Sequence, residues 1–311
     1  KKYILANISY NESNMIIPPK LNKGDKVALI ATARHISKEE LIPAIDIIKK
    51  WGLEVVFSDN VFKIKNQFAG ADNERANDLQ KMLDDKSIKA IFCVRGGYGT
   101  VRIIDKIDFS IFLDNPKWLV GYSDVTVLHN HINNLGVASL HASMPINFKD
   151  NTVKSLLSIS SCLFGEQNNI SCKPFSLNKL GVTKGVVVGG NLSVIYSLLG
   201  SPSDINTEDK ILFLEDLDEY LYHVDRMAFN LFRNQKFKNI KGLIVGGMTK
   251  MNDNNIPFGN NANEIILKQV QHLDIPICFN FPSGHLDNNL SIIFGKESCL
   301  SVSIDKVELS Q

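Results

Sequence analysis

Short apolar runs alternate with longer amphipathic segments along the first half of the chain. The apolar runs predict buried strands over residues 26–32, 53–57, 89–94 and 118–121. Between and after them, apolar residues recur at helical spacing and predict helices over residues 72–83, 124–135 and 153–164. Strands that alternate with helices indicate a parallel sheet with helices on both faces.

The first helix of this half carries its own start and stop signals. Ser37 and Glu40 have the spacing of a capping box, in which each side chain bonds the backbone N–H of the other residue. Leu41 and Ile45 begin an apolar face at helical spacing, and Gly52 supplies the stop. In sheets of this kind the functional residues lie at the carboxyl ends of the strands, so the turns that follow the strands are the candidate sites.

The second half is poorer in long helices and richer in predicted strands. Strands are expected over residues 185–191, 211–214, 241–245, 276–279, 291–294 and 298–304, with helices after residue 191 and over 263–272. We therefore expect an α/β fold with a Rossmann-like, parallel-sheet N-terminal domain and a smaller, β-rich C-terminal domain. Its expected parts are an appendage over residues 1–14, the first domain over 15–165, a polar linker over 166–184, and the second domain over 185–311.

The composition of the chain bears on its cellular compartment and on the classes of partner that it could bind. The 311 residues are 44% hydrophobic and 22% charged, with a net charge of +1, so bulk charge gives no case for a nucleic acid or a membrane surface as partner. No apolar run approaches the length of a membrane span. The five cysteines are scattered and form no C-x-x-C pair, which argues against a zinc site or a disulfide framework and favours a reduced, cytoplasmic setting.

One serine stands at a predicted strand-to-helix turn, in the segment Gly121-Tyr122-Ser123-Asp124. A nucleophile gains there from the helix N-terminus and from neighbouring backbone N–H groups. A glycine-rich turn, Arg95-Gly96-Gly97-Tyr98-Gly99, follows the preceding strand. It lacks the spacing of either phosphate-binding glycine motif, so together with the serine it is interpreted as a loop that donates to an oxyanion.

A serine nucleophile needs a base and a group that orients the base. Of seven histidines, His285 is the most suggestive, because it follows an apolar run in the turn Pro282-Ser283-Gly284-His285, whereas His129 and His131 fall inside a predicted helix. Glu215 ends a predicted buried strand, and the acids after it are expected to form partly a solvated helix start. The order serine, acid, histidine matches that of α/β-hydrolases, but the second glycine of their G-x-S-x-G elbow is missing.

These motifs in this order resemble the LD-carboxypeptidases, also called muramoyltetrapeptide carboxypeptidases. The resemblance runs from about Lys20 to Val302. Its markers are the glycine turn and the serine turn, then His141 with Met144, Gly189-Gly190-Asn191-Leu192, Leu214-Glu215-Asp216, Asp225-Arg226 and Gly284-His285. The chain departs from the pattern in two places: Ala31-Thr32-Ala33-Arg34 stands where many members have a proline–serine turn, and His141-Ala142-Ser143-Met144 replaces the usual His-Gly-Pro-Met.

The resemblance implies a role for each site residue. Ser123 would be the nucleophile, His285 the general base and then acid, and Glu215 the group that orients it. Backbone N–H groups of Gly97 and Asp124 would form the oxyanion hole, and Arg95 and Asn191 would bind substrate. The family releases the terminal D-alanine from murein tetrapeptides during cell-wall recycling in the cytoplasm, as a homodimer, without metal or cofactor.

Other readings of the sequence stay open at this stage. Related enzymes cleave an amide in a peptide–nucleotide antibiotic and carry an extra loop with substrate-stacking aromatics in the second domain, where this chain has a short polar stretch over residues 250–263 with only Phe258. A non-catalytic binding module on the same scaffold would not need all three triad residues. The substrate carboxylate has three candidate partners, Arg95, Arg226 and Lys250, among which the sequence does not choose.

Overall fold

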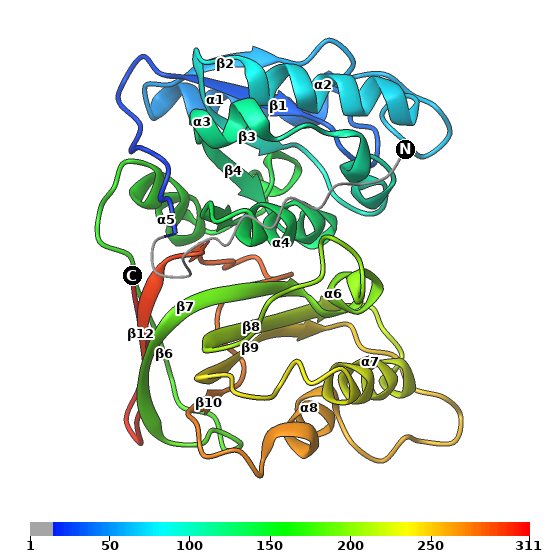
Figure 1. Cartoon of the computed structure of the whole chain (residues 1–311), viewed down its shortest axis with the longest axis vertical. Coiled ribbons are helices and arrows are strands. Elements are labelled where there is room, and N and C mark those ends of the chain that lie inside the picture. Colours follow the sequence, from blue (N-terminus) through cyan, green and yellow to red (C-terminus); the bar gives the residue numbers. More distant parts are fainter. Residues whose placement is uncertain (1–14) are drawn as a thin grey trace.

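A computed structural model describes residues 15–311, and the predicted appendage over residues 1–14 lies outside the described residues. The chain forms two sheets, one above the other in Figure 1. The six-stranded first sheet has the order β11-β5-β4-β3-β1-β2, and every neighbouring pair except β11 with β5 is parallel. Its strands are β1 Lys26–Ile30, β2 Glu54–Phe57, β3 Ile88–Cys93, β4 Trp118–Gly121, β5 Ser139–His141 and β11 Ile292–Phe294.

Helices cover both faces of this sheet, as the alternation of apolar residues predicts. On one face α1 and α5 pack on side chains such as Val27 and Leu29, and on the other α2 and α4 pack on Ala28 and Ile30. The capping box of Ser37 and Glu40 is confirmed at the start of α1. The helices are α1 Lys38–Lys50, α2 Asp72–Asp84, α3 Ser110–Asp114, α4 Thr126–Asn134 and α5 Val153–Leu163.

The second sheet has seven strands in the order β10-β9-β8-β7-β12-β13-β6, which confirms the β-rich second domain. Strands β7 to β10 are parallel to one another, and β12, β13 and β6 extend the sheet antiparallel. They are β6 Asn169–Cys172, β7 Gly181–Asn191, β8 Lys210–Leu217, β9 Gly242–Thr249, β10 Ile277–Cys278, β12 Glu297–Val302 and β13 Val307–Ser310. Helices α6 Leu192–Leu198, α7 Leu221–Arg233 and α8 Ala262–Val270 pack on one face.

Two details of the structure differ from the boundaries that the sequence suggests. The expected linker, residues 166–184, contains β6 and the start of β7, so it is partly sheet. Strand β11, from the expected second domain, pairs antiparallel with β5 of the first sheet. Neither departure has a local signal, because pairing with a distant segment decides both: β6 pairs with β13, the start of β7 with β12, and β11 with β5.

Aromatic side chains join the two sheets behind the serine turn. Phe294 of β11 is fully buried, and its ring centroid lies 5.1 Å from that of His141 and 5.8 Å from that of Phe213 on β8. His129 of α4 contacts Phe294 edge-on and bonds to the Gly121 carbonyl oxygen. The predicted helical histidine is therefore a packing residue that ties α4 to the end of β4.

We expect Phe294→Ala to lower the free energy of unfolding by about 3–5 kcal/mol, because the truncation leaves a cavity between the two sheets. Urea denaturation monitored by circular dichroism measures this change. The matched control is Ile304→Ala, whose side chain is 79% exposed and should change stability little. Equal unfolding midpoints for the two variants would contradict a structural role for this contact.

Candidate active site

The serine turn places Ser123 in a conformation that few side chains adopt. Strand β4 ends at Gly121, Tyr122 stays extended, and Ser123 then takes a φ of +61° before a 3-10 turn leads into α4. A left-handed φ costs a non-glycine residue roughly 1–2 kcal/mol, which the surrounding fold must supply. The turn is tight: a Cβ on Gly121 would lie 2.8 Å from Val125 Cγ2. The chain thus holds the serine at the carboxyl end of the sheet, as the sequence predicts.

His285 lies on a loop that follows β10 and approaches β8 very closely. Gly284 has a φ of +112°, and a Cβ there would lie 2.8 Å from both Glu215 Cβ and Oε2. Only glycine lets the loop come this near. Asn289 Oδ1 accepts a 2.8 Å hydrogen bond from the Gly284 N–H, and the Thr249 hydroxyl donates to the His285 carbonyl at 3.3 Å. The position of the imidazole is therefore set by bonds on both sides of it.

The three residues predicted as a triad form a chain of hydrogen-bond contacts. Glu215 Oε2 lies 2.6 Å from His285 Nδ1 and also accepts the His285 backbone N–H at 3.2 Å. His285 Nε2 lies 3.2 Å from Ser123 Oγ. Glu215 is fully buried, while the His285 side chain is 13% exposed. The structure thus brings together residues that are 162 positions apart in sequence.

Neighbouring negative charges favour the protonated form of His285, whereas its burial favours the neutral form. Burial lowers the pKa of His285, but the charge and hydrogen bond of Glu215 oppose it, so the pKa is raised above its ordinary value. Asp216 adds to this effect, and its own pKa is raised to about 7 by burial and by the adjacent Glu215 charge. The Tyr122 ring packs on the imidazole with centroids 4.7 Å apart. The arrangement suits an imidazole that takes up a proton next to a serine.

The acidic segment around Glu215 corrects one sequence expectation. Strand β8 continues through Glu215 and Asp216, which are 0% and 2% exposed, and α7 begins only at Leu221. Asp216 is therefore not part of a solvated helix start. Both faces of β8 are buried, and Asp216 is accommodated there because Asn191 Nδ2 and the Ser193 N–H donate to its carboxylate.

The glycine loop lies directly beside the serine. A Cβ on Gly96 would lie 3.3 Å from Ser123 Cβ and 3.5 Å from the Asp124 backbone nitrogen. The Asp124 side chain accepts the Thr100 N–H at 2.9 Å, which fastens the start of the serine helix to the end of the loop. Burial raises the pKa of Asp124. The backbone of Gly97 and that of Asp124, the two predicted oxyanion donors, thus belong to segments in mutual contact.

The two predicted substrate-binding residues are both engaged with the protein. Arg95 donates to the His35 carbonyl oxygen at 3.0 Å and lies 3.8 Å from Glu40 Oε1. Asn191 is 3% exposed and caps α6, because its Oδ1 accepts the Val194 N–H while its Nδ2 donates to Asp216. Its backbone N–H donates to Thr126 Oγ1 of α4 at 3.0 Å. Thr126, which sequence reasoning missed, therefore joins the two domains three residues from Ser123.

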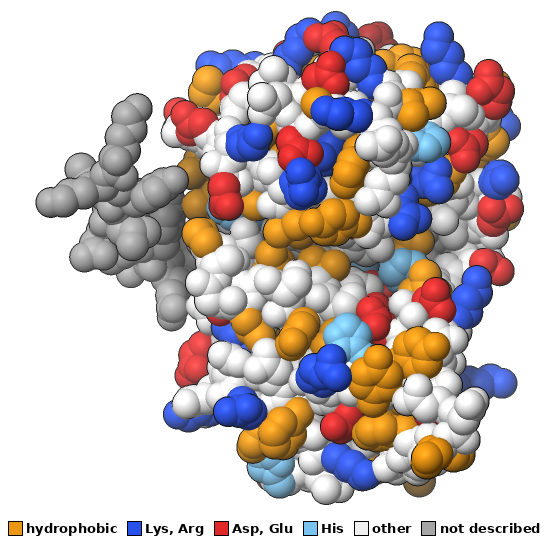
Figure 2. Space-filling view, turned by 90° about the vertical axis from the view of Figure 1, so that its right-hand side faces the viewer, with side chains coloured by type: hydrophobic (Ala, Val, Ile, Leu, Met, Phe, Trp, Pro, Cys, Tyr) orange, Lys and Arg blue, Asp and Glu red, His pale blue; other side chains and the backbone are white. Residues whose placement is uncertain are grey.

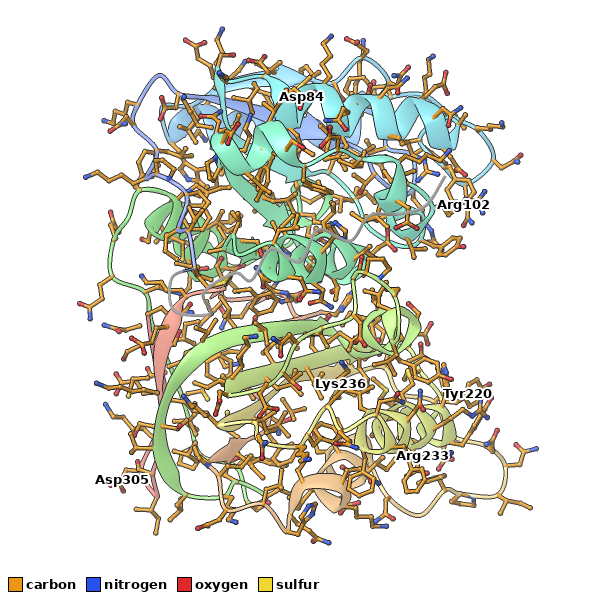
Figure 3. All side chains as sticks on the ribbon, viewed as in Figure 1. Asp84, Arg102, Tyr220, Arg233, Lys236 and Asp305 are labelled. Atoms are coloured by element: carbon orange, nitrogen blue, oxygen red, sulfur yellow. The ribbon has the colours of Figure 1, made fainter. Side chains whose placement is uncertain are left out.

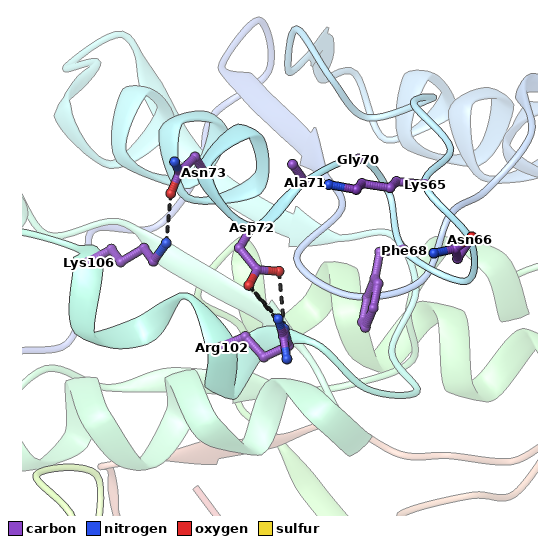
Figure 4. A pocket seen from close by; sticks show the side chains of 9 residues that line it. All are labelled: Lys65, Asn66, Phe68, Gly70, Ala71, Asp72, Asn73, Arg102 and Lys106. Atoms are coloured by element: carbon purple, nitrogen blue, oxygen red, sulfur yellow. Dashed lines mark hydrogen bonds and ion pairs between the residues drawn. The ribbon is translucent and has the colours of Figure 1, made fainter.

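The structure has two hollows, and neither is lined by Ser123, Glu215 or His285. One, of about 450 Å³, lies at the start of α2; it is lined by Phe68 with Lys65, Arg102 and Lys106, and Asp72 pairs with Arg102 across it (Figure 4). The other, of about 470 Å³, lies between α6 and α7. Its lining is Tyr196, Tyr222, Asp225, Arg226, Phe229, Asn230, Arg233 and Phe258. Figure 2 shows the right-hand side of Figure 1, where α6 and α7 lie, and hydrophobic side chains gather on the lower half of this view. Figure 3 labels Tyr220 and Arg233, which stand at the two ends of α7.

Other kinds of site are not evident in residues 15–311. No group of three or more metal-ligating side chains occurs there, and all five cysteines have free thiols. Among the same residues, no helix is both long and apolar enough to cross a membrane.

Comparison with known proteins agrees with the geometry. Models of the LD-carboxypeptidase N-terminal and C-terminal domains match residues 27–142 and 184–300. A probable murein peptide carboxypeptidase of Bacillus subtilis (strain 168) is 34% identical over 299 residues, which are 92% of each chain.

Two solved structures share the whole fold. Muramoyltetrapeptide carboxypeptidase from Oxalobacter formigenes superposes with a TM-score of 0.84 at 25% identity, over 92% of this chain and 98% of that one. An MccF-like protein from Bacillus anthracis gives 0.82, also at 25% identity, over 95% and 98%. The chain therefore belongs to the LD-carboxypeptidase family of serine carboxypeptidases, as the resemblance of its motifs indicates.

Proposed function

We propose that this carboxypeptidase releases the terminal D-alanine from murein tetrapeptides, by cutting the bond between the L-configured centre of the diamino acid and D-Ala. The observation that carries the proposal is the contact chain from Ser123 through His285 to the buried Glu215. The names of the B. subtilis relative and the O. formigenes structure point to the same class of substrate.

In the proposed mechanism Ser123 Oγ attacks the scissile carbonyl carbon while its proton passes to His285 Nε2. The carbonyl π electrons move to oxygen, and the backbone N–H groups of Gly97 and Asp124 hold the resulting oxyanion. The C–N bond then breaks as His285 returns the proton to the leaving amine, which gives free D-Ala and an acyl-Ser123 ester. Water, deprotonated by His285, hydrolyses the ester and restores the serine.

Glu215 has two functions in this scheme. Because its Oε2 accepts from both Nδ1 and the backbone N–H of His285, it fixes the ring orientation and leaves Nε2 unprotonated toward the serine. Its negative charge, buried in β8, also stabilises the imidazolium formed during attack. We assign Asn191 an indirect role, since its bonds to Asp216 and Thr126 hold the strand of Glu215 against the helix of Ser123.

A second candidate function is cleavage of an amide in a peptide–nucleotide. The hollow between α6 and α7 favours it, because Tyr196, Phe229 and Phe258 line it, and aromatic side chains are the kind on which a nucleobase stacks. The MccF-like structure at 25% identity supports the same scaffold. The triad chemistry would be unchanged, so side-by-side turnover of a murein tetrapeptide and a peptidyl sulfamoyl nucleotide decides between the two.

The family resemblance further suggests a cytoplasmic homodimer.

We expect Ser123→Ala to lower kcat for D-Ala release from a murein tetrapeptide by about 10⁴-fold or more, because alanine has no hydroxyl to attack the scissile carbonyl. Released D-Ala is measured with a D-amino-acid oxidase assay. Ser176→Ala, which changes an exposed serine of a distant loop, is the matched control and should keep wild-type turnover. Full activity in Ser123→Ala would remove the triad from the mechanism.

We expect Glu215→Gln to shift the acidic limb of the pH–rate profile to lower pH. A base works only when unprotonated, so activity rises with pH through the pKa of His285. The Glu215 carboxylate raises that pKa, and its removal lets the pKa fall. The plateau rate should also drop, by about 10⁴-fold in the closest analogous change known for serine proteases. The profile of kcat/KM against pH measures both effects, with Glu297→Gln as the exposed control. If the acidic limb does not move, Glu215 does not control the pKa of His285, and the prediction is wrong.

A further inference from the structure

A carboxypeptidase that removes one residue has to recognise the terminal carboxylate, and two of the three basic residues named from sequence are already engaged. Arg95 is bonded to the His35 carbonyl oxygen, and the Arg226 guanidinium lies 5.3 Å from the centre of the Tyr222 ring. Lys250 remains exposed directly after β9, next to Thr249, whose hydroxyl donates to the His285 carbonyl oxygen. A fourth basic residue, Arg34, is in direct contact with the glycine loop.

The backbone of Arg34 is fixed, while its side chain is uncommitted. Its N–H donates to the Gly96 carbonyl at 3.4 Å, and Arg34 forms an antiparallel bridge with Phe68 on its other side. Within residues 15–311, the guanidinium of this exposed residue makes no ion pair and no hydrogen bond. An arginine with a fixed backbone and an unpaired guanidinium is well placed to bind an anion from solution.

The contact with the loop locates this charge relative to the nucleophile. A Cβ on Gly97 would lie 2.6 Å from both Cδ and Nε of Arg34, so the side chain runs across that glycine. The preceding residue, Gly96, faces Ser123 Cβ and the Asp124 nitrogen. The two contacts are thus one residue apart, about 3.8 Å between Cα atoms. One residue is also what separates the scissile carbonyl from the terminal carboxylate in the proposed substrate.

We propose that the Arg34 guanidinium binds the C-terminal carboxylate of the peptide and so restricts the enzyme to release of a single terminal residue. This inference rests on the proposed function. Arg34 lies outside the contact chain of Ser123, His285 and Glu215, so its role would be in substrate specificity rather than in bond cleavage. A planar guanidinium donates two parallel hydrogen bonds to a carboxylate, which a lysine does not reproduce.

The test compares two substrates that differ only in the group recognised: a murein tetrapeptide with a free terminal carboxylate, and the same peptide ending in D-alanine amide. For wild type and for Arg34→Ala, Arg34→Lys, Lys250→Ala and Lys65→Ala, kcat/KM is measured on both. We expect Arg34→Ala to lower kcat/KM for the acid by about 10–100-fold and to change the value for the amide little. Arg34→Lys should restore part of the loss. Lys65→Ala, which removes an exposed charge of the basic hollow in Figure 4, should match wild type.

Each other outcome has a separate meaning. Equal losses on acid and amide for Arg34→Ala would overturn the inference, because a purely structural role affects both substrates alike. A loss of the acid preference in Lys250→Ala, with that preference kept in Arg34→Ala, would overturn it in favour of the lysine. If wild-type enzyme releases no D-alanine from the acid, the proposed function itself fails, and this result does not depend on Arg34.

Discussion

The hydrogen bonds from His285 to Glu215 are the constraint around which the rest of the site is arranged. A carboxylate with no exposure is costly unless it is paired, and Glu215 Oε2 meets two N–H groups of the same residue. To reach them, the loop must pass so close to β8 that only glycine fits at position 284. The amide of Asn289 then holds that loop from its other side. These contacts link strand β8, the loop after β10 and the His285 imidazole to one another.

Ser123 comes from the other domain, so its 3.2 Å distance from His285 Nε2 depends on how the two domains meet. Close to the site this contact is polar: the Asn191 N–H donates to Thr126 Oγ1, and Asn191 in turn bonds to Asp216 beside Glu215. Gly190 adds to it, because a Cβ there would lie 2.5 Å from the Thr126 side chain. Behind it lies the aromatic packing of Phe294, His141 and Phe213. The short polar bridge sets the position, and the aromatic layer keeps the two halves together.

Local pattern predicted much of this architecture from the sequence. Strands β1 to β4, helices α1, α2, α4 and α5, the capping box at Ser37 and the three residues now found in contact at the site all carry local signals, such as an apolar run followed by a glycine turn. The short elements α3 and β5 were not predicted. The continuation of β8 through Asp216 carries none, because two consecutive acids are polar by every local measure. Only partners from elsewhere, Asn191 and Ser193, make that burial possible. Likewise, nothing in Ala33-Arg34 indicates that its side chain crosses Gly97, since the contact joins segments more than sixty residues apart.

The pairing of β11 with β5 has a consequence for the order in which the chain can fold. During synthesis the first five strands of the first sheet leave the ribosome long before residues 292–294. Until then β5 is an open edge, able to pair with another chain. His285 lies in the same late segment as β11. In the proposed mechanism an unfinished chain would therefore contain the nucleophile but not its base, and hydrolysis would begin only after the strand that closes the first sheet has been made.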